Sequence, residues 1–211
     1  QGRPGVVTSF DRRALVDAAT RAGAVIELVP GVGEFVGPQD ELLRVHGGRL
    51  DAAQLALLVE IEDERTIEQD PAFAMRIVVD TAIRALSPAI NDPTTAVLAL
   101  DQIHRLLRFV GKRRLHDAIV HDSAGQVRLL LRTPNWDDFV HIAFTEIRAC
   151  GAHNVQIARR MRAMLENLVH SLPESRHAAL MQQLDLLDRT LPDHYKLAED
   201  LALARVPDSQ G

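Results

Sequence analysis

One predicted helix between Asp70 and Pro88 limits, more than any other feature, how this chain can fold. Asp70 followed by Pro71 supplies a helix cap and a proline at the first helical position, and Ser87-Pro88 ends the helix near residue 86. At about 100° per residue, apolar side chains cover most of its circumference, and the polar residues gather in one charged stripe. The charged stripe consists of Arg76, Asp80, Arg84 and Ser87. A helix that is apolar nearly all round is typical of a buried position, so we expect it at the centre of the fold.

The hydrophobic pattern changes near residue 50, which divides the chain into two predicted domains. Residues 1–49 alternate short apolar runs with glycine and proline turns, which predicts a small β-α-β-β lobe whose strands form one sheet. Residues 50–206 follow a helical period with one β-hairpin near 118–131, and 207–211 form a polar tail. The predicted fold class is α+β and predominantly helical, with a small N-terminal β-rich lobe followed by a helical bundle-like body with one β-hairpin.

Capping signals predict where the helices of the second domain begin. A helix capped by Asp51 is expected to extend as far as Glu62. Asn135 and Ser171 each precede an acidic residue by three positions, the spacing of a capping box. The other helices are predicted near residues 71–86, 92–110, 136–149, 153–170, 174–190 and 195–204.

Charge and cysteine content exclude several classes of function. The formal net charge of −5 provides no uniform positive field, so we expect no nucleic-acid partner. Cys150 is the single cysteine, which excludes an intramolecular disulfide and a cysteine-rich zinc site. The first lysine is Lys112, so the N-terminal lobe cannot carry a lysine-linked cofactor, and we expect no cofactor. No run approaches the roughly 18–20 apolar residues that a spanning helix needs, so we expect the printed chain to be soluble.

The charged stripe is the first candidate ligand-binding site. One interpretation is an ion-pair ladder, in which Asp80 bridges Arg76 and Arg84, four residues away on either side. The other interpretation is that the stripe faces a cleft or a second subunit, where the two arginines would bind a small anionic ligand. Structural ion-pair networks often resemble sites, so the sequence favours the ladder over a ligand site.

The corner between the two central helices, residues 87–95, is the second candidate. Its polar members are Ser87, Asn91, Asp92, Thr94 and Thr95. A helix start offers free backbone N–H groups to a phosphate, but an ionised Asp92 at the cap would occupy those donors and repel an anion. Asp70, Asp80, Asn91 and Asp92 carry oxygen ligands suited to Mg²⁺ or Ca²⁺, but they lack the spacing of a loop-type site. We therefore expect no metal.

Secondary candidates lie on either side of these two sites. They are Arg65, Asp70, Asp101 and His104. Asp101 and His104 share one face of a predicted helix, where they could form an acid-base pair or an ordinary hydrogen bond. The sequence alone does not separate these two interpretations.

Three further motifs carry less weight. His116-Asp117 and His121-Asp122 resemble the pairs of metal phosphohydrolases, but such sites need further ligands, and solvated loop residues are the simpler interpretation. Cys150 with His153 could supply a nucleophile and a base, but nothing nearby activates the thiolate. We interpret Cys150 as an inert small side chain.

The central segment also carries a resemblance to a known family. It reads Arg65-Thr66-Ile67-Glu68-Gln69-Asp70-Pro71-Ala72-Phe73-Ala74-Met75-Arg76 and continues through Asp80 to Arg84-Ala85-Leu86-Ser87-Pro88-Ala89-Ile90-Asn91-Asp92-Pro93-Thr94-Thr95-Ala96. This stretch resembles the signature of the domain of unknown function 2254 family, which consists of predicted bacterial membrane proteins. The resemblance implies a transmembrane portion N-terminal to the printed residues and a soluble C-terminal region, with no established reaction. The full-length protein is then expected in the cell membrane, with this part on the cytoplasmic side.

The functional hypothesis follows from the charged stripe and the corner together. We expect a non-enzymatic module that senses a small anionic ligand or assembles subunits, most simply as a homo-oligomer. The alternative is a hydrolase or transferase that acts on a phosphorylated or acidic small molecule. In that enzyme the arginines would bind the anion, and Asp80 or Asp92 would act as base or as a metal ligand.

Overall fold

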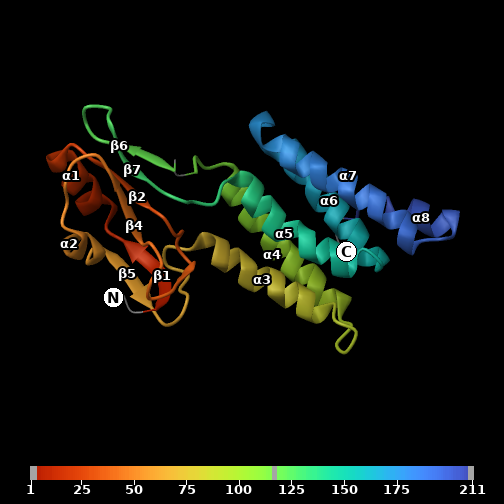
Figure 1. Ribbon diagram of the computed structural model, residues 1–211. Helices are drawn as coiled ribbons and strands as arrows, with labels where there is room; N and C mark the ends of the chain where they lie inside the picture. Colours follow the sequence, from red (N-terminus) through yellow and green to blue (C-terminus); the bar gives the residue numbers. More distant parts are fainter. Residues whose placement is uncertain (1–3, 116–117, 209–211) are drawn as a thin grey trace. The chain divides into compact units, whose positions relative to one another are not determined.

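The computed structural model describes residues 4–115 and 118–208, which form two compact units (Figure 1). The first, called the sheet unit, comprises residues 4–73 and 118–133 of the described chain. The second, called the helical unit, comprises residues 74–115 and 134–208. The boundary differs from the one predicted at residue 50, because the hairpin near 118–131 belongs to the first unit and the chain passes between the units three times.

Two small sheets and two helices make up the sheet unit. Its elements are β1 (Gly5–Phe10), α1 (Arg12–Ala22), β2 (Val25–Leu28), β3 (Phe35–Val36), β4 (Leu43–His46), α2 (Ala52–Ala56), β5 (Val59–Glu62), β6 (Ile119–His121) and β7 (Val127–Leu130). One sheet has the antiparallel order β3-β1-β5, and the other has the order β4-β2-β7-β6. The pair β2 and β7 is parallel and aligns Ile26 with Leu129.

The second sheet packs on α1 to form the main core of this unit. Leu15 of α1, Ile26 of β2 and Leu129 of β7 are all 0% exposed and belong to one cluster. Asp11 caps α1 by accepting a hydrogen bond from the Ala14 N–H at 2.9 Å, as the sequence predicts. Gly23, with φ of 63°, ends the helix in the left-handed conformation that glycine adopts without strain.

Two predictions for this region are wrong. The strands of the lobe do not form one sheet, because β1 pairs with β5 whereas β2 pairs with β4 and β7. The helix capped by Asp51 ends at Ala56, and residues 59–62 form a strand instead. The sequence Val59-Glu60-Ile61-Glu62 alternates apolar and polar residues, which is the period of a strand with one buried face.

The helical unit is built around α6. Its elements are α3 (Pro71–Ala85, shared at its first turn with the sheet unit), α4 (Pro93–Gly111), α5 (Trp136–Gly151), α6 (Val155–Ser171), the 3-10 turn η1 (Glu174–Arg176), α7 (His177–His194) and α8 (Ala198–Ala204). Helix α6 contacts α4, α5, α7 and α8. Leu100, Phe144, Met161 and Leu187 are 0% exposed and represent the apolar core of this unit. The predicted α+β, predominantly helical fold class is confirmed.

The capping predictions are correct at Asn135 and wrong at Ser171. Asn135 accepts from the Asp138 N–H at 3.0 Å, and the Asp138 carboxylate accepts from the Asn135 N–H at 2.8 Å, which is a complete capping box. Ser171 is instead the last residue of α6, and its buried hydroxyl makes no hydrogen bond within the described chain. Pro173 then begins η1 without a side-chain cap.

The expectation that α3 is buried at the centre of the fold is wrong for one of its faces. Met75 and Val79 are 1% and 0% exposed, so one side of the helix packs into the unit. Ile77 is 46% exposed, and Asp80 and Arg84 are also exposed. Helix α3 is therefore a half-buried helix with a surface that mixes apolar and charged side chains.

We predict that Leu129→Ala destabilises the sheet unit by about 2–5 kcal/mol, because it opens a cavity where β7 packs against β2 and α1. The measurement is the midpoint of urea unfolding followed by circular dichroism. Leu57→Ala is the matched control, since Leu57 is 84% exposed in the same unit, and its effect should stay within about 0.5 kcal/mol. Equal effects of the two substitutions would contradict the placement of β7.

Candidate functional site

The charged stripe on α3 does not form the predicted ladder. Arg76 donates from Nη1 to Oε1 of Glu146 on α5, at 2.5 Å. Neither the Asp80 nor the Arg84 side chain has a hydrogen-bond or ion-pair partner within residues 4–115 and 118–208. Two opposite charges therefore remain on the exposed face of α3, one helical turn apart.

These two charges belong to a definite surface. Ile77, Asp80, Thr81 and Arg84 are exposed and lie within about 100° of the helix circumference. We call these four residues the α3 surface. The Thr81 hydroxyl is bonded to the backbone carbonyl of Ile77 at 2.9 Å, so it offers no free donor. The α3 surface thus presents one acid, one base and one large apolar side chain to its surroundings.

The corner at residues 87–95 is a tightly capped turn. The Asp92 carboxylate accepts from the Thr95 hydroxyl at 2.5 Å and from the Thr95 N–H at 3.1 Å. The Thr95 hydroxyl, then the N–H groups of Thr95 and Thr94, hold the pKa of Asp92 below its ordinary value. The Ser87 carbonyl accepts from the Asn91 N–H at 2.8 Å, and Asn91 has a φ of 47°. An ionised carboxylate therefore already occupies the start of α4, which disfavours a second anion there.

Arg65, which is exposed, and the buried Asp70 form an ion pair at the start of α3. Arg65 Nε donates to Asp70 Oδ2 at 2.6 Å, and Asp70 is 2% exposed. Asp70 Oδ1 accepts from the Phe73 N–H at 2.9 Å and so caps the helix. The Arg65 guanidinium lies 4.7 Å from the centre of the Phe73 ring. Gly33, with φ of 87°, packs its backbone directly against both members of the pair. Every polar contact here serves the fold, which gives the pair a structural role.

Asp101 and His104 come together through a third residue, which lies on α6. Arg160 of α6 is 6% exposed and donates from Nε to Asp101 Oδ1 at 2.8 Å. Its Nη2 lies 3.3 Å from His104 Nδ1, and because arginine only donates, Nδ1 is the acceptor. His104 Nε2 then carries the proton and donates to Asn167 Oδ1 at 3.0 Å.

The environment of His104 keeps its imidazole neutral. Burial lowers the pKa of His104, and the positive charges of Arg160 and Arg108 lower it further, against the hydrogen bond to Asn167. Both Asp101 and His104 are engaged by Arg160 rather than by each other. The hydrogen-bonding interpretation of this pair is therefore favoured over the acid-base interpretation.

The remaining motifs have structural roles or lie outside the described residues. Asp122 accepts from Arg128 Nε at 2.7 Å and from the Gln126 N–H at 2.9 Å, and these bonds, the arginine first, lower the pKa of its carboxyl. The Cys150 thiol donates to the Ile147 carbonyl at 3.6 Å, and burial raises its pKa, which disfavours the thiolate. His116 and Asp117 lie outside the described residues. In the part of the chain that the structure describes, no three His, Cys, Asp or Glu side chains gather closely enough to hold a metal ion.

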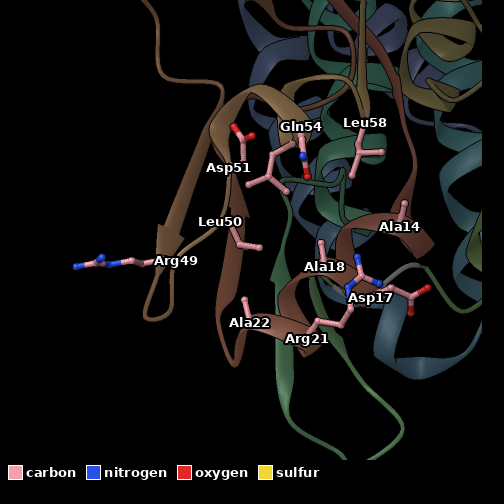
Figure 2. Close-up of a pocket in the computed structure, with 11 residues that line it drawn as sticks. Ala14, Asp17, Ala18, Arg21, Ala22, Arg49, Leu50, Asp51, Gln54 and Leu58 are labelled. Atoms are coloured by element: carbon pink, nitrogen blue, oxygen red, sulfur yellow. The ribbon is translucent and has the colours of Figure 1, made fainter.

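A pocket of about 590 Å³ lies between α1 and residues 49–58 of the sheet unit (Figure 2). Ala14, Ala18 and Ala22 line the α1 side of this pocket. They recur every four residues, so their small side chains lie along one face of the helix. Figure 2 shows Arg49 extending away from the other labelled side chains. The sequence analysis missed this pocket, although the alanine spacing is a visible signal.

The sequence analysis also missed a groove between α5 and α7 in the helical unit. It has a volume of about 400 Å³ and is lined in part by Arg148 and Gln183. Gln183 lies on the buried face of α7 together with Leu180 and Leu187. A polar residue inside an otherwise apolar helical stripe was the signal that could have revealed it.

The chain is thus an α+β protein of two units. Its main polar features are the capped corner at residues 87–95, the buried Arg160 with its partners, and the exposed α3 surface. The chain belongs to the family described as "Predicted membrane protein (DUF2254)", whose family model matches residues 1–167. It is 30% identical over 146 residues to uncharacterized proteins of Mycobacterium bovis and Mycobacterium tuberculosis. That match covers 69% of this chain and 28% of each relative, so the chain spans just over a quarter of their length. No solved structure matches the chain.

The family assignment confirms the resemblance carried by the central segment. Among the helices that the structure describes, none is both long enough and apolar enough to cross a membrane.

We predict that Gly33→Ala destabilises the chain by about 1–3 kcal/mol more than Gly125→Ala, because a Cβ at residue 33 would collide with the Arg65–Asp70 pair. Gly125 is the matched control, since it also has a positive φ, 76°, but has open space around it. Both variants carry the backbone cost of about 1–2 kcal/mol for a left-handed residue. Thermal unfolding of the three proteins measures the difference, and equal losses would rule out a tight contact at Gly33.

We predict that the neutral state of His104 makes stability depend on pH. Its pKa is lower in the folded chain than in the unfolded chain, so the unfolded chain binds more protons and stability falls as the pH drops below about 6.5. His104→Gln should reduce the stability lost between about pH 7 and pH 5, measured by urea unfolding at each pH. His121→Gln, at an exposed position in β6, should keep the wild-type pH dependence. An unchanged pH dependence of stability in His104→Gln would contradict the neutral, partly buried imidazole.

Proposed function

We propose that this chain is a self-association module of a bacterial membrane protein, in which two copies meet through the α3 surface. The observation that carries the proposal is the pair of unpartnered opposite charges, Asp80 and Arg84, beside the 46% exposed Ile77. An exposed apolar side chain next to unpaired charges of both signs is self-complementary, which is the requirement for contact between identical subunits.

A two-fold axis near residue 82, between Asp80 and Arg84, satisfies both charges at once. If two α3 helices pack antiparallel, Asp80 of one copy lies opposite Arg84 of the second, and the same contact is repeated across the axis. An exposed ion pair contributes only about 0.2–1 kcal/mol, but two reciprocal pairs that lose water on contact also fix the register of the helices. Ile77 supplies apolar area at the edge of the same contact.

The alternative, a hydrolase or transferase, has less support from the geometry. Asp92 is occupied by its cap bonds to Thr95, so it is poorly placed to act as a base. Arg76 is paired with Glu146, which leaves one arginine of the stripe for an anion. We therefore keep assembly as the proposed function.

The proposal includes a location. The family is described as predicted membrane proteins, and the 146 matched residues are only 28% of each relative. We propose that the remainder of the polypeptide supplies the transmembrane segments and that this part lies on the cytoplasmic side. The free thiol of Cys150 supports a reducing compartment.

We predict that reversing one charge on the α3 surface weakens self-association of the chain and that exchanging both charges restores it. Asp80→Arg places like charges opposite each other twice, and so does Arg84→Asp, so each should weaken self-association by at least about tenfold. The double variant Asp80→Arg/Arg84→Asp should associate like the wild type. Sedimentation velocity of the 211-residue chain over a concentration series measures all four proteins.

Mixing the two single variants is the decisive control. Each variant alone repels itself, whereas one copy of each gives two opposite-charge pairs, so the mixture should form a heterodimer that native mass spectrometry resolves. Glu199→Arg, at an exposed position on α8, is a matched charge reversal that should leave association unchanged. A wild-type chain that stays monomeric at every concentration, or variants that associate equally well, would overturn the proposal.

A further inference from the structure

The groove between α5 and α7 carries an inference that is independent of the α3 surface. The two helices run side by side in the same direction: Trp136 Nε1 donates to the Arg176 carbonyl at 2.9 Å near their starts, and Arg148 Nη1 donates to Thr190 Oγ1 at 3.1 Å near their ends. Figure 1 shows the same arrangement of α5 and α7. Between these contacts lies the groove of about 400 Å³, a volume within the range of small-molecule sites.

Two polar atoms on the wall of the groove are buried without a partner. Gln183 is 5% exposed, and its Oε1 accepts no hydrogen bond within the described residues. Arg148 Nε is also buried and donates to no atom there, although Nη1 of the same guanidinium is bonded. Buried polar groups in folded proteins nearly always have partners, so an unpartnered donor and an unpartnered acceptor on residues that line one groove indicate a missing partner.

The charge of Arg148 is equally uncompensated. It forms no ion pair with any carboxylate in residues 4–115 and 118–208, and Glu146 on the same helix is engaged by Arg76. Asp137 and Asp138 line the other end of the groove, where the Asp138 carboxylate is held in the capping box with Asn135 and Asp137 is exposed. A half-buried guanidinium with a free N–H is therefore the dominant charge at its end of the groove, and it suits a carboxylate.

The rest of the wall limits the size and shape of a ligand. Val140, Ala179 and Leu186 supply an apolar side, and Thr145 and His141, joined at 3.1 Å, supply a polar one. Gln183 lies roughly 10 Å before Thr190 along α7, and the Arg148 side chain leans back toward the start of α5. A small organic molecule in the groove can therefore lie between the two side chains.

We propose that this groove binds a small carboxylate with an apolar side chain and a hydroxyl or amino group next to the carboxyl carbon. The carboxylate accepts from Arg148 Nε, the neighbouring O–H or N–H donates to Gln183 Oε1, and the apolar side chain lies along Val140 and Leu186. The ligand class is that of 2-hydroxy and 2-amino acids. Both kinds satisfy the same two atoms.

Three probes of matched shape test this assignment: L-leucine, L-2-hydroxy-4-methylpentanoate and 4-methylpentanoate. The third probe lacks the donor for Gln183. Chemical-shift perturbation in the ¹⁵N-labelled chain, with probe up to about 50 mM, measures each dissociation constant. We expect at least one of the first two to bind roughly tenfold more tightly than 4-methylpentanoate, and the tighter of the two identifies the amino or the hydroxy class.

Variants assign the binding to the two unpartnered atoms. Arg148→Gln should weaken binding of all three probes by at least roughly tenfold. Gln183→Leu should abolish the preference over 4-methylpentanoate while leaving 4-methylpentanoate itself bound, and it should raise the melting temperature because it removes an unsatisfied buried acceptor. Gln102→Leu, at an exposed position on α4 outside the groove, should keep the wild-type preference.

The result can also overturn the assignment. Failure of all three probes to perturb residues of α5 and α7 in the wild-type chain would do so. The assignment would also be overturned if Gln183→Leu kept the preference for the hydroxy or amino acid over 4-methylpentanoate. Another residue would then accept the hydrogen bond from the ligand. Neither result depends on whether the chain self-associates through α3.

Discussion

The helical unit depends on the need to satisfy one buried positive charge, that of Arg160. A guanidinium that is 6% exposed must have close partners, and Asp101 and His104 of α4 supply them. This requirement fixes the register of α6 against α4, and α6 is the helix on which α5, α7 and α8 also pack. It also fixes the tautomer of His104, because an arginine cannot accept a hydrogen bond. Asp101 and His104, which could have formed a catalytic pair, therefore bind Arg160 and connect α4 to α6.

Local signals in the sequence predicted most helix boundaries because caps act within three or four residues. Asp11, Asp92 and Asn135 cap helices as expected, since each side chain reaches a backbone N–H that is close in sequence. Ser171 has the same spacing but fails, because the chain continues the preceding helix through it and Pro173 begins the next turn. Short-range signals of this kind cannot predict strand pairing. Strand β7 pairs with β2 across about half of the chain, so the pairing depends on shape and burial that no short stretch of sequence contains.

The candidate site shows the same division between local and distant effects. The sequence placed Arg76, Asp80 and Arg84 on one stripe correctly, but the partner of Arg76 is Glu146, seventy positions away. Because Arg76 pairs with Glu146, the ion-pair ladder does not form, and Asp80 and Arg84 remain unpaired among the described residues on the exposed face of α3. Gln183 was missed for a related reason: only the packing of α5 against α7 shows that its amide is buried without a partner.

The parallel pairing of β2 with β7 also sets the order in which the protein can be completed as it leaves the ribosome. Roughly 100 residues separate the two strands, so at ordinary rates of synthesis β2 waits ~5–20 s for its neighbour. During that interval α1, β2 and β4 can form, but one edge of β2 offers free backbone N–H and C=O groups beside buried apolar side chains. The emerging chain therefore passes through a stage in which its innermost strand edge is open, and a chaperone that covers such edges would shield it until the hairpin of β6 and β7 arrives.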